Sequence, residues 1–146
     1  MFSFILTFIN VFLYQIKKLM LLKDFYTLDS IENTDVNKYS AAITLNKDHD
    51  IFKGHFPGNP VTPGVCMMQI IKEITESILN TTLTMVSTSN VKFMALINPE
   101  VNPKLTLDLE ISENEASEIK VKNTTSFEET VALKLSNTYK RTTSWK

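Results

Sequence analysis

Apolar and polar residues alternate along most of the chain after Leu21. The clearest example is 105–112, where Leu105, Leu107, Leu109 and Ile111 share one face and polar residues share the other. Segment 25–32 reads as the first arm of a hairpin, and three further segments follow the same period of two: 39–46, 119–122 and 131–136. This period is typical of half-buried antiparallel strands. Segment 33–38 reads as a hairpin turn after the first strand, and 98–103 as a proline-bounded loop.

The segment from Val65 to Asn80 has a helical period instead. One stripe is apolar, and a second, polar stripe includes Gln69 and Glu73. Pro63 suits the entry of this helix because its fixed φ is tolerated in the first turn. The pattern predicts an α+β domain over residues 20–146, with one long helix wrapped by an antiparallel sheet of five to six strands.

Composition narrows the classes of function. The chain has 146 residues, which suits a single domain, and a net charge of −1, which gives no field to attract nucleic acid. A single cysteine, Cys66, rules out a disulfide within the chain, and two histidines plus one cysteine match no familiar zinc spacing. We therefore expect a cytoplasmic protein that binds no nucleic acid.

Residues 1–19 form a hydrophobic N-terminal extension. The first 16 residues carry no charge, and the segment lacks the basic leader and cleavage site of a secretory signal. A membrane span needs roughly 20 apolar residues, so this segment would make a marginal anchor. We expect that translation begins at Met20, and membrane attachment only if residues 1–19 are translated and inserted.

The loop GHFPGNPVTPGV, residues 54–65, holds the main candidate chemistry. His55 suits proton transfer because the ordinary pKa of histidine lies close to neutral. Gly64 lies at the expected helix N-terminus, where free N–H groups can hold a carbonyl oxygen that gains negative charge. By residue type alone, His55 is compatible with two roles: a structural one, and removal of a proton that enolises a thioester.

This loop closely resembles the GHFPxxPxxPGV signature of bacterial 3-hydroxyacyl-acyl-carrier-protein dehydratases. The resemblance implies the hotdog fold, no cofactor, and a homodimer that is often assembled into a trimer of dimers. It also implies an acyl-carrier-protein substrate whose acyl chain lies along the dimer interface. His55 then matches the catalytic histidine, and Gly64 the glycine whose N–H polarises the thioester carbonyl. Five residues are expected to line the substrate tunnel: Phe56, Pro63, Val65, Met68 and Phe93.

The sequence departs from the resemblance at the acid. The dehydratases carry Glu or Asp where this chain has Gln69, and commonly carry glutamine where it has Glu73. An amide cannot exchange a proton near neutral pH. Positions i and i+4 are neighbours on a helix, so Glu73 could supply or support the acid through Gln69 or a water. Alternatively, Glu73 belongs to a solvated polar face and Gln69 only positions the substrate.

We therefore expect a dehydratase that forms trans-2-enoyl thioesters, with His55, Gly64, Gln69 and Glu73 at its catalytic site. Two alternatives stay open: a catalytically weak subunit that binds acyl carriers beside an active partner, and a thioesterase on the same fold. Cys66 is expected to be a buried apolar residue rather than a nucleophile, and His49 to face solvent in a loop.

Overall fold

The computed structural model describes residues 24–53, 58 and 60–142, and its main element is one six-stranded antiparallel sheet. The strands are β1 (Tyr26–Asp35), β2 (Lys38–Leu45), β3 (Leu83–Phe93), β4 (Lys104–Glu113), β5 (Ile119–Phe127) and β6 (Thr130–Arg141). They lie in the order β1-β2-β4-β5-β6-β3, so β1 and β3 form the two edges. The predicted strands are confirmed, including the hairpin between β1 and β2, in which Asn37 has a φ of 61°.

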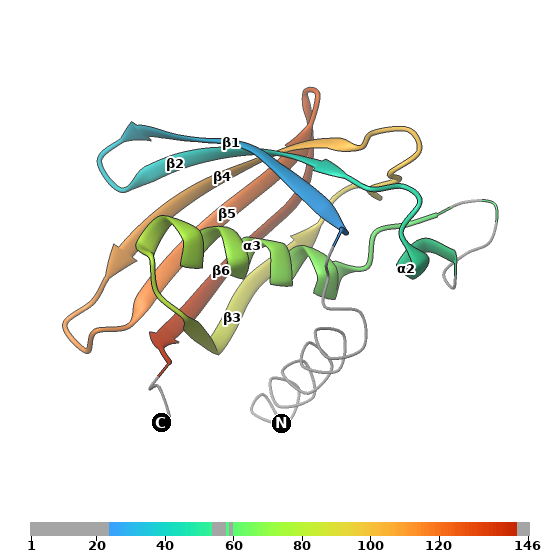
Figure 1. Ribbon diagram of the computed structural model, residues 1–146. Coiled ribbons are helices and arrows are strands. Elements are labelled where there is room, and N and C mark those ends of the chain that lie inside the picture. Colours follow the sequence, from blue (N-terminus) through green and yellow to red (C-terminus); the bar gives the residue numbers. More distant parts are fainter. Residues whose placement is uncertain (1–23, 54–57, 59, 143–146) are drawn as a thin grey trace.

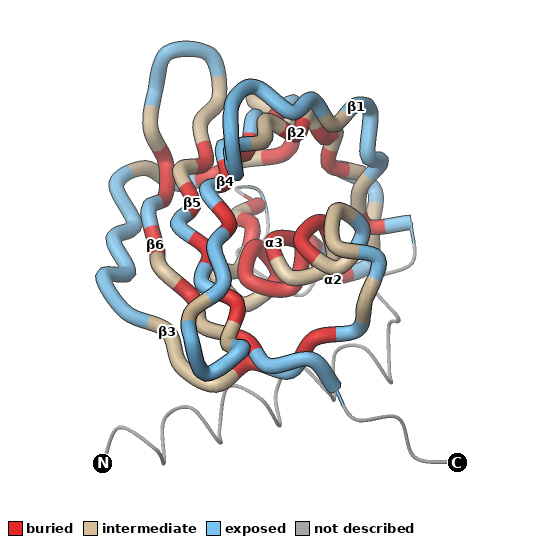
Figure 2. The backbone as a smooth tube through the Cα atoms, turned by 90° about the vertical axis from the view of Figure 1, so that its left-hand side faces the viewer, coloured by how far each residue is buried: buried red, intermediate tan, exposed pale blue. Residues whose placement is uncertain are grey.

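The helix α3 (Gly64–Leu79) runs along the concave side of the sheet (Figure 1). In the view of Figure 2, the sheet curves around α3, and much of α3 is coloured as buried. Pro63 is the N-cap residue, and its carbonyl accepts the N–H groups of Cys66 at 3.0 Å and Met67 at 3.3 Å. Asn80 ends the helix with a φ of 52° and donates its N–H to the Glu76 carbonyl. The predicted helix is therefore confirmed to within one residue at each end.

The core lies between α3 and the inner face of the sheet. Alternate residues of β4 are buried, and the register continues this inner face across the neighbouring strands. Ala41 of β2 pairs with Leu107, which in turn pairs with Thr125 of β5. Ile70, Ile71 and Ile74 supply the helix side of the same core. The buried face of the strands and the apolar stripe of the helix thus pack together in one hydrophobic cluster.

Two elements were not predicted from the pattern. The edge strand β3 begins with alternate burial at Leu83 and Met85 and then becomes mostly polar, and its register shifts twice against β6. The short helix α2 (Asp50–Lys53) buries Ile51 and Phe52, and the Phe52 ring stacks on Phe25 at 5.3 Å between centroids. Residues 1–19 lie outside the described residues, so the predictions made for that extension remain predictions.

Candidate functional site

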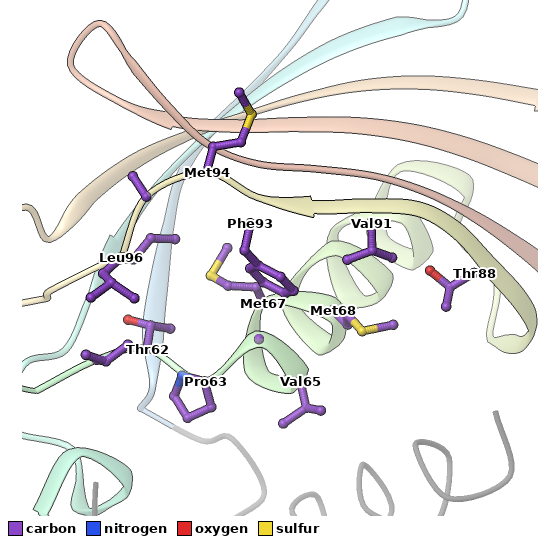
Figure 3. Close-up of a pocket in the computed structure, with 14 residues that line it drawn as sticks. Thr62, Pro63, Val65, Met67, Met68, Thr88, Val91, Phe93, Met94 and Leu96 are labelled. Carbon is purple, nitrogen blue, oxygen red and sulfur yellow. The ribbon is translucent and has the colours of Figure 1, made fainter. Parts of the chain in front are cut away.

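A groove of about 660 Å³ opens at the N-terminal end of α3. Three segments line it: the stretch 61–63, the first turns of the helix, and the end of β3 with the residues that follow it (Figure 3). Most lining side chains are apolar, and two of the residues, Thr62 and Thr88, carry a side-chain hydroxyl. The groove therefore offers an apolar surface next to a helix N-terminus, where unpaired N–H groups favour negative charge.

The first residue of α3 is Gly64, and the Phe93 ring occupies the space where a side chain at this position would stand. A Cβ atom on residue 64 would lie 2.6 Å from Phe93 Cζ, which is closer than real Cβ contacts. Phe93 comes from the end of β3, and 59% of its surface is exposed. Glycine at position 64 thus lets this ring lie over the start of the helix, as Figure 3 shows.

Five of the predicted site residues line this one groove: Pro63, Gly64, Val65, Met68 and Phe93. They come from two segments about 25 positions apart in the sequence, joined by the approach of β3 to the start of α3. Their roles toward a substrate remain predictions. The predicted catalytic His55 and the predicted lining residue Phe56 lie outside the described residues.

The other two predicted catalytic residues, Gln69 and Glu73, lie on α3 but do not line the groove. Gln69 is buried, with 3% of its surface exposed, and its Nε2 has no hydrogen-bond partner in the described part of the chain. Gln69 Nε2 therefore does not reach the carboxylate of Glu73 in this structure. A buried amide donor without a partner is unfavourable, which makes Gln69 a candidate for contact with a ligand.

Glu73 has a partner that the sequence did not indicate. Its Oε2 accepts a hydrogen bond from the hydroxyl of Tyr26 at 3.3 Å, and both side chains are partly buried. Burial raises the pKa of Tyr26, and the Glu73 carboxylate raises it further, so the hydroxyl stays protonated as a donor. The two residues are 47 positions apart, and no motif spacing links them.

The two remaining candidate side chains have structural environments. Cys66 is buried, and burial raises the pKa of its thiol to about 12, which leaves little thiolate for nucleophilic attack. This agrees with the expectation of a buried apolar residue. His49 is half-buried rather than solvent-facing: its ring meets Phe25 edge to face at 5.2 Å, and its Nδ1 accepts the N–H of Ile51.

Neither a metal site nor a membrane-spanning helix is found among the residues that the structure describes. Within them, no three or more His, Cys, Asp or Glu side chains gather in a way that could hold a metal ion. None of their helices has the length and apolar character needed to cross a membrane.

The match to a protein family decides where the chain belongs. The model of the ApeI-like family, described as ApeI dehydratase, matches residues 31–134, which include β2, α3, β3, β4 and β5 in full. The chain belongs to the ApeI-like dehydratase family. Among curated proteins, it is 33% identical over 46 residues to the 3-hydroxyacyl-[acyl-carrier-protein] dehydratase FabZ of Lactococcus lactis. That match spans 32% of this chain and only 30% of the relative.

Solved structures of the same shape show the fold of this ApeI-like chain. The dehydratase heterocomplex ApeI:P from Xenorhabdus doucetiae matches with a TM-score of 0.59 and 22% identity, over 79% of this chain and 97% of that chain. A hypothetical thioesterase from Streptococcus pneumoniae, solved with coenzyme A, also gives 0.59, with 13% identity over 87% and 96% of the two chains. The hotdog fold is confirmed, and it is shared by dehydratases and thioesterases.

Proposed function

We propose that this chain dehydrates 3-hydroxyacyl thioesters of acyl carrier protein to trans-2-enoyl thioesters. The observation that carries the proposal is the apolar groove at the start of α3, inside the part of the chain that matches the dehydratase family. An acyl chain needs an apolar groove, and its thioester carbonyl needs hydrogen-bond donors where negative charge develops. Both requirements can be met where the groove reaches Gly64.

Each residue then has a defined step. His55 removes the proton from C2, while the N–H of Gly64 stabilises the enolate-like transition state. The double bond forms between C2 and C3 as the C3–O bond breaks, and the hydroxyl leaves as water after it receives a proton. In this proposal Glu73, or the protonated His55, supplies that proton, and Gln69 positions the substrate through its Nε2, which has no hydrogen-bond partner among the described residues. Gln69 and Glu73 follow the groove-lining part of α3, so the substrate has to extend beyond the groove to reach them. The reaction needs no redox cofactor and no metal.

We also infer that the protein acts as a homodimer that accepts its substrate from acyl carrier protein in the cytoplasm. Support comes from exposed apolar side chains at the free edge of β3 and just after it: Val91, Phe93, Met94 and Leu96. A second copy that covers this edge would remove these side chains from water. Such a dimer would also close the groove that the same residues line.

One assay tests the proposed reaction. The purified full chain is incubated with a 3-hydroxybutyryl thioester of acyl carrier protein, and mass spectrometry follows both enoyl product and free carrier thiol. We expect enoyl product from the wild-type chain and its loss in His55→Ala. The control is His49→Ala, which removes the other histidine of the chain, placed away from the groove. Enoyl formation that survives His55→Ala contradicts the proposed base.

A second function is a binding subunit that holds an acyl carrier and depends on an active partner. Gln69 at the position of the usual acid favours it, and so does the description of the ApeI:P structure as a heterocomplex. In the same assay, substrate that binds but stays unchanged would support this alternative. Free carrier thiol without enoyl product would instead support thioester hydrolysis, the activity named for some proteins of this fold.

A further inference from the structure

Thr62 carries a buried hydroxyl in the wall of the groove. Only 6% of its surface is exposed, and its Oγ1 has no hydrogen-bond partner among the described residues. Its backbone is held in place, because the Thr62 N–H donates to the carbonyl of Ile97 at 2.8 Å. Thr62 precedes Gly64 by two positions, and both residues line the same groove (Figure 3).

This hydroxyl is unusual among the threonines near it. Thr75, which is fully buried in α3, donates its hydroxyl to the Ile71 carbonyl at 2.8 Å. Thr88, at the other end of the groove lining, donates to the carbonyl of Ser136 at 3.4 Å. A buried hydroxyl without a partner lowers stability, whereas valine would fill the same volume without that penalty. Thr62 lines the groove, but its Oγ1 atom is itself covered in this structure. A bound molecule that supplies the missing partner therefore has to meet this hydroxyl after a change of the Thr62 rotamer.

We propose that Thr62 Oγ1 forms a hydrogen bond with the 3-hydroxyl group of a bound 3-hydroxyacyl thioester. Thr62 would thereby set the preference of the groove for hydroxylated over unsubstituted acyl groups. This inference rests on the proposed function. A threonine hydroxyl both donates and accepts, which complements another hydroxyl, whereas a carbonyl oxygen only accepts.

The placement of the two groups fits one substrate. With the thioester carbonyl at the N–H of Gly64, the 3-hydroxyl lies two carbons further along the acyl chain. Two residues of extended chain span at most about 7 Å, so Thr62 and Gly64 can contact neighbouring parts of the same acyl group. The remaining groove wall is apolar and would take the rest of the chain.

Equilibrium binding tests the inference without turnover. The His55→Ala chain is titrated with 3-hydroxybutyryl-pantetheine and with butyryl-pantetheine, alone and with Thr62→Val added. We expect Thr62→Val to weaken binding of the hydroxyacyl thioester roughly three- to tenfold. Binding of the butyryl thioester should stay unchanged, and the melting temperature should stay equal or rise.

Two further variants in the same background separate binding from folding. Thr62→Ser keeps the hydroxyl and should keep the preference for the hydroxyacyl thioester. Thr75→Val, the matched control outside the groove, should lower the melting temperature and leave the ratio of the two dissociation constants unchanged.

An equal effect of Thr62→Val on both thioesters, or no effect on either, would overturn the inference. The inference would also be overturned if the His55→Ala chain, with Thr62 intact, bound neither thioester measurably. The proposed function fails separately, if the wild-type chain forms no enoyl product although the binding preference and its loss in Thr62→Val are both observed.

Discussion

At the scale of single residues, Glu73 of α3 is held by a hydrogen bond from the sheet. The Tyr26 hydroxyl reaches its Oε2 from the start of β1, so the carboxylate is attached to the sheet as well as to α3. Hydrogen bonds to charged groups are stronger than those between neutral groups. This contact therefore limits the positions that the Glu73 carboxylate can take, whichever role the carboxylate has in the reaction.

We expect Glu73→Gln to lower kcat by at least tenfold, because general acid catalysis typically contributes a factor of about 10² to 10⁴. The measurement is steady-state enoyl formation from the 3-hydroxybutyryl carrier thioester. Glu76→Gln is the matched control: Glu76 is one turn away, and its Oε2 accepts the N–H of Leu83, which a glutamine can also do. Undiminished turnover in Glu73→Gln would exclude Glu73 as the acid.

Tyr26→Phe should have a smaller effect on the same step. The change removes only the hydroxyl that donates to Glu73, so we expect kcat to fall severalfold while KM stays within a factor of two. The free energy of unfolding should fall by about 1 kcal/mol, the typical contribution of one hydrogen bond. Thermal melts and initial rates on the same preparation measure both quantities. A loss of stability with unchanged kcat would give Tyr26 a purely structural role.

Cys66 should react slowly with alkylating reagents in the folded protein. Burial raises the pKa of this thiol to about 12, so at pH 8 it is almost wholly protonated. We expect iodoacetamide to modify Cys66 at least tenfold more slowly in buffer than in 6 M guanidinium chloride, as followed by intact mass. Fast modification of the native protein would show that the thiol is accessible and ionised.

At the scale of elements, the packing of β3 against the start of α3 defines the groove. Gly64→Ala would place a methyl group where the Phe93 ring now lies. Because that ring is more than half exposed, it can swing outward, and we expect a stability loss below about 1 kcal/mol. Binding of butyryl-pantetheine should nevertheless weaken, since the displaced ring changes the groove.

A double-mutant cycle with Phe93→Ala isolates this contact. If the ring causes the effect, Gly64→Ala should weaken thioester binding much less when residue 93 is already alanine. Additive effects of the two changes would show that the methyl group acts on the ligand directly. Isothermal titration on the four proteins of the cycle gives the coupling energy.

Whether the sequence predicts an element depends on how that element is buried. Central strands such as β4 bury one face completely, so their alternation is unbroken and easy to recognise. The edge strand β3 is covered by a neighbour on one side only and contains two register shifts, which interrupt its period after Met85. The loop signature likewise located Gly64, but contacts such as Tyr26 with Glu73 depend on tertiary packing and leave no local pattern.

At the scale of the whole molecule, exposed apolar residues gather along one edge. Four of the large hydrophobic residues exposed within the described chain lie between Val91 and Leu96, on or just beyond the edge strand β3. Such a cluster beside an unpaired strand edge is unfavourable for an isolated chain, because it invites association. The same residues line the groove, so association here and the shape of the substrate site are linked.

We therefore expect the double variant Met94→Glu/Leu96→Glu to shift the protein from dimer to monomer at micromolar concentration. Leu96 is 71% exposed and Met94 is also exposed, so neither charge disturbs the core of the subunit. Each charge would, however, be buried without a partner in a dimer that covers this edge. Val36→Glu is the matched control, because Val36 is 80% exposed in the turn between β1 and β2, away from β3. Light scattering coupled to size-exclusion chromatography measures the mass of all three proteins, and enoyl formation should fall with the loss of the dimer. A wild-type chain that is already monomeric, or a double variant that stays dimeric, would place the subunit interface elsewhere.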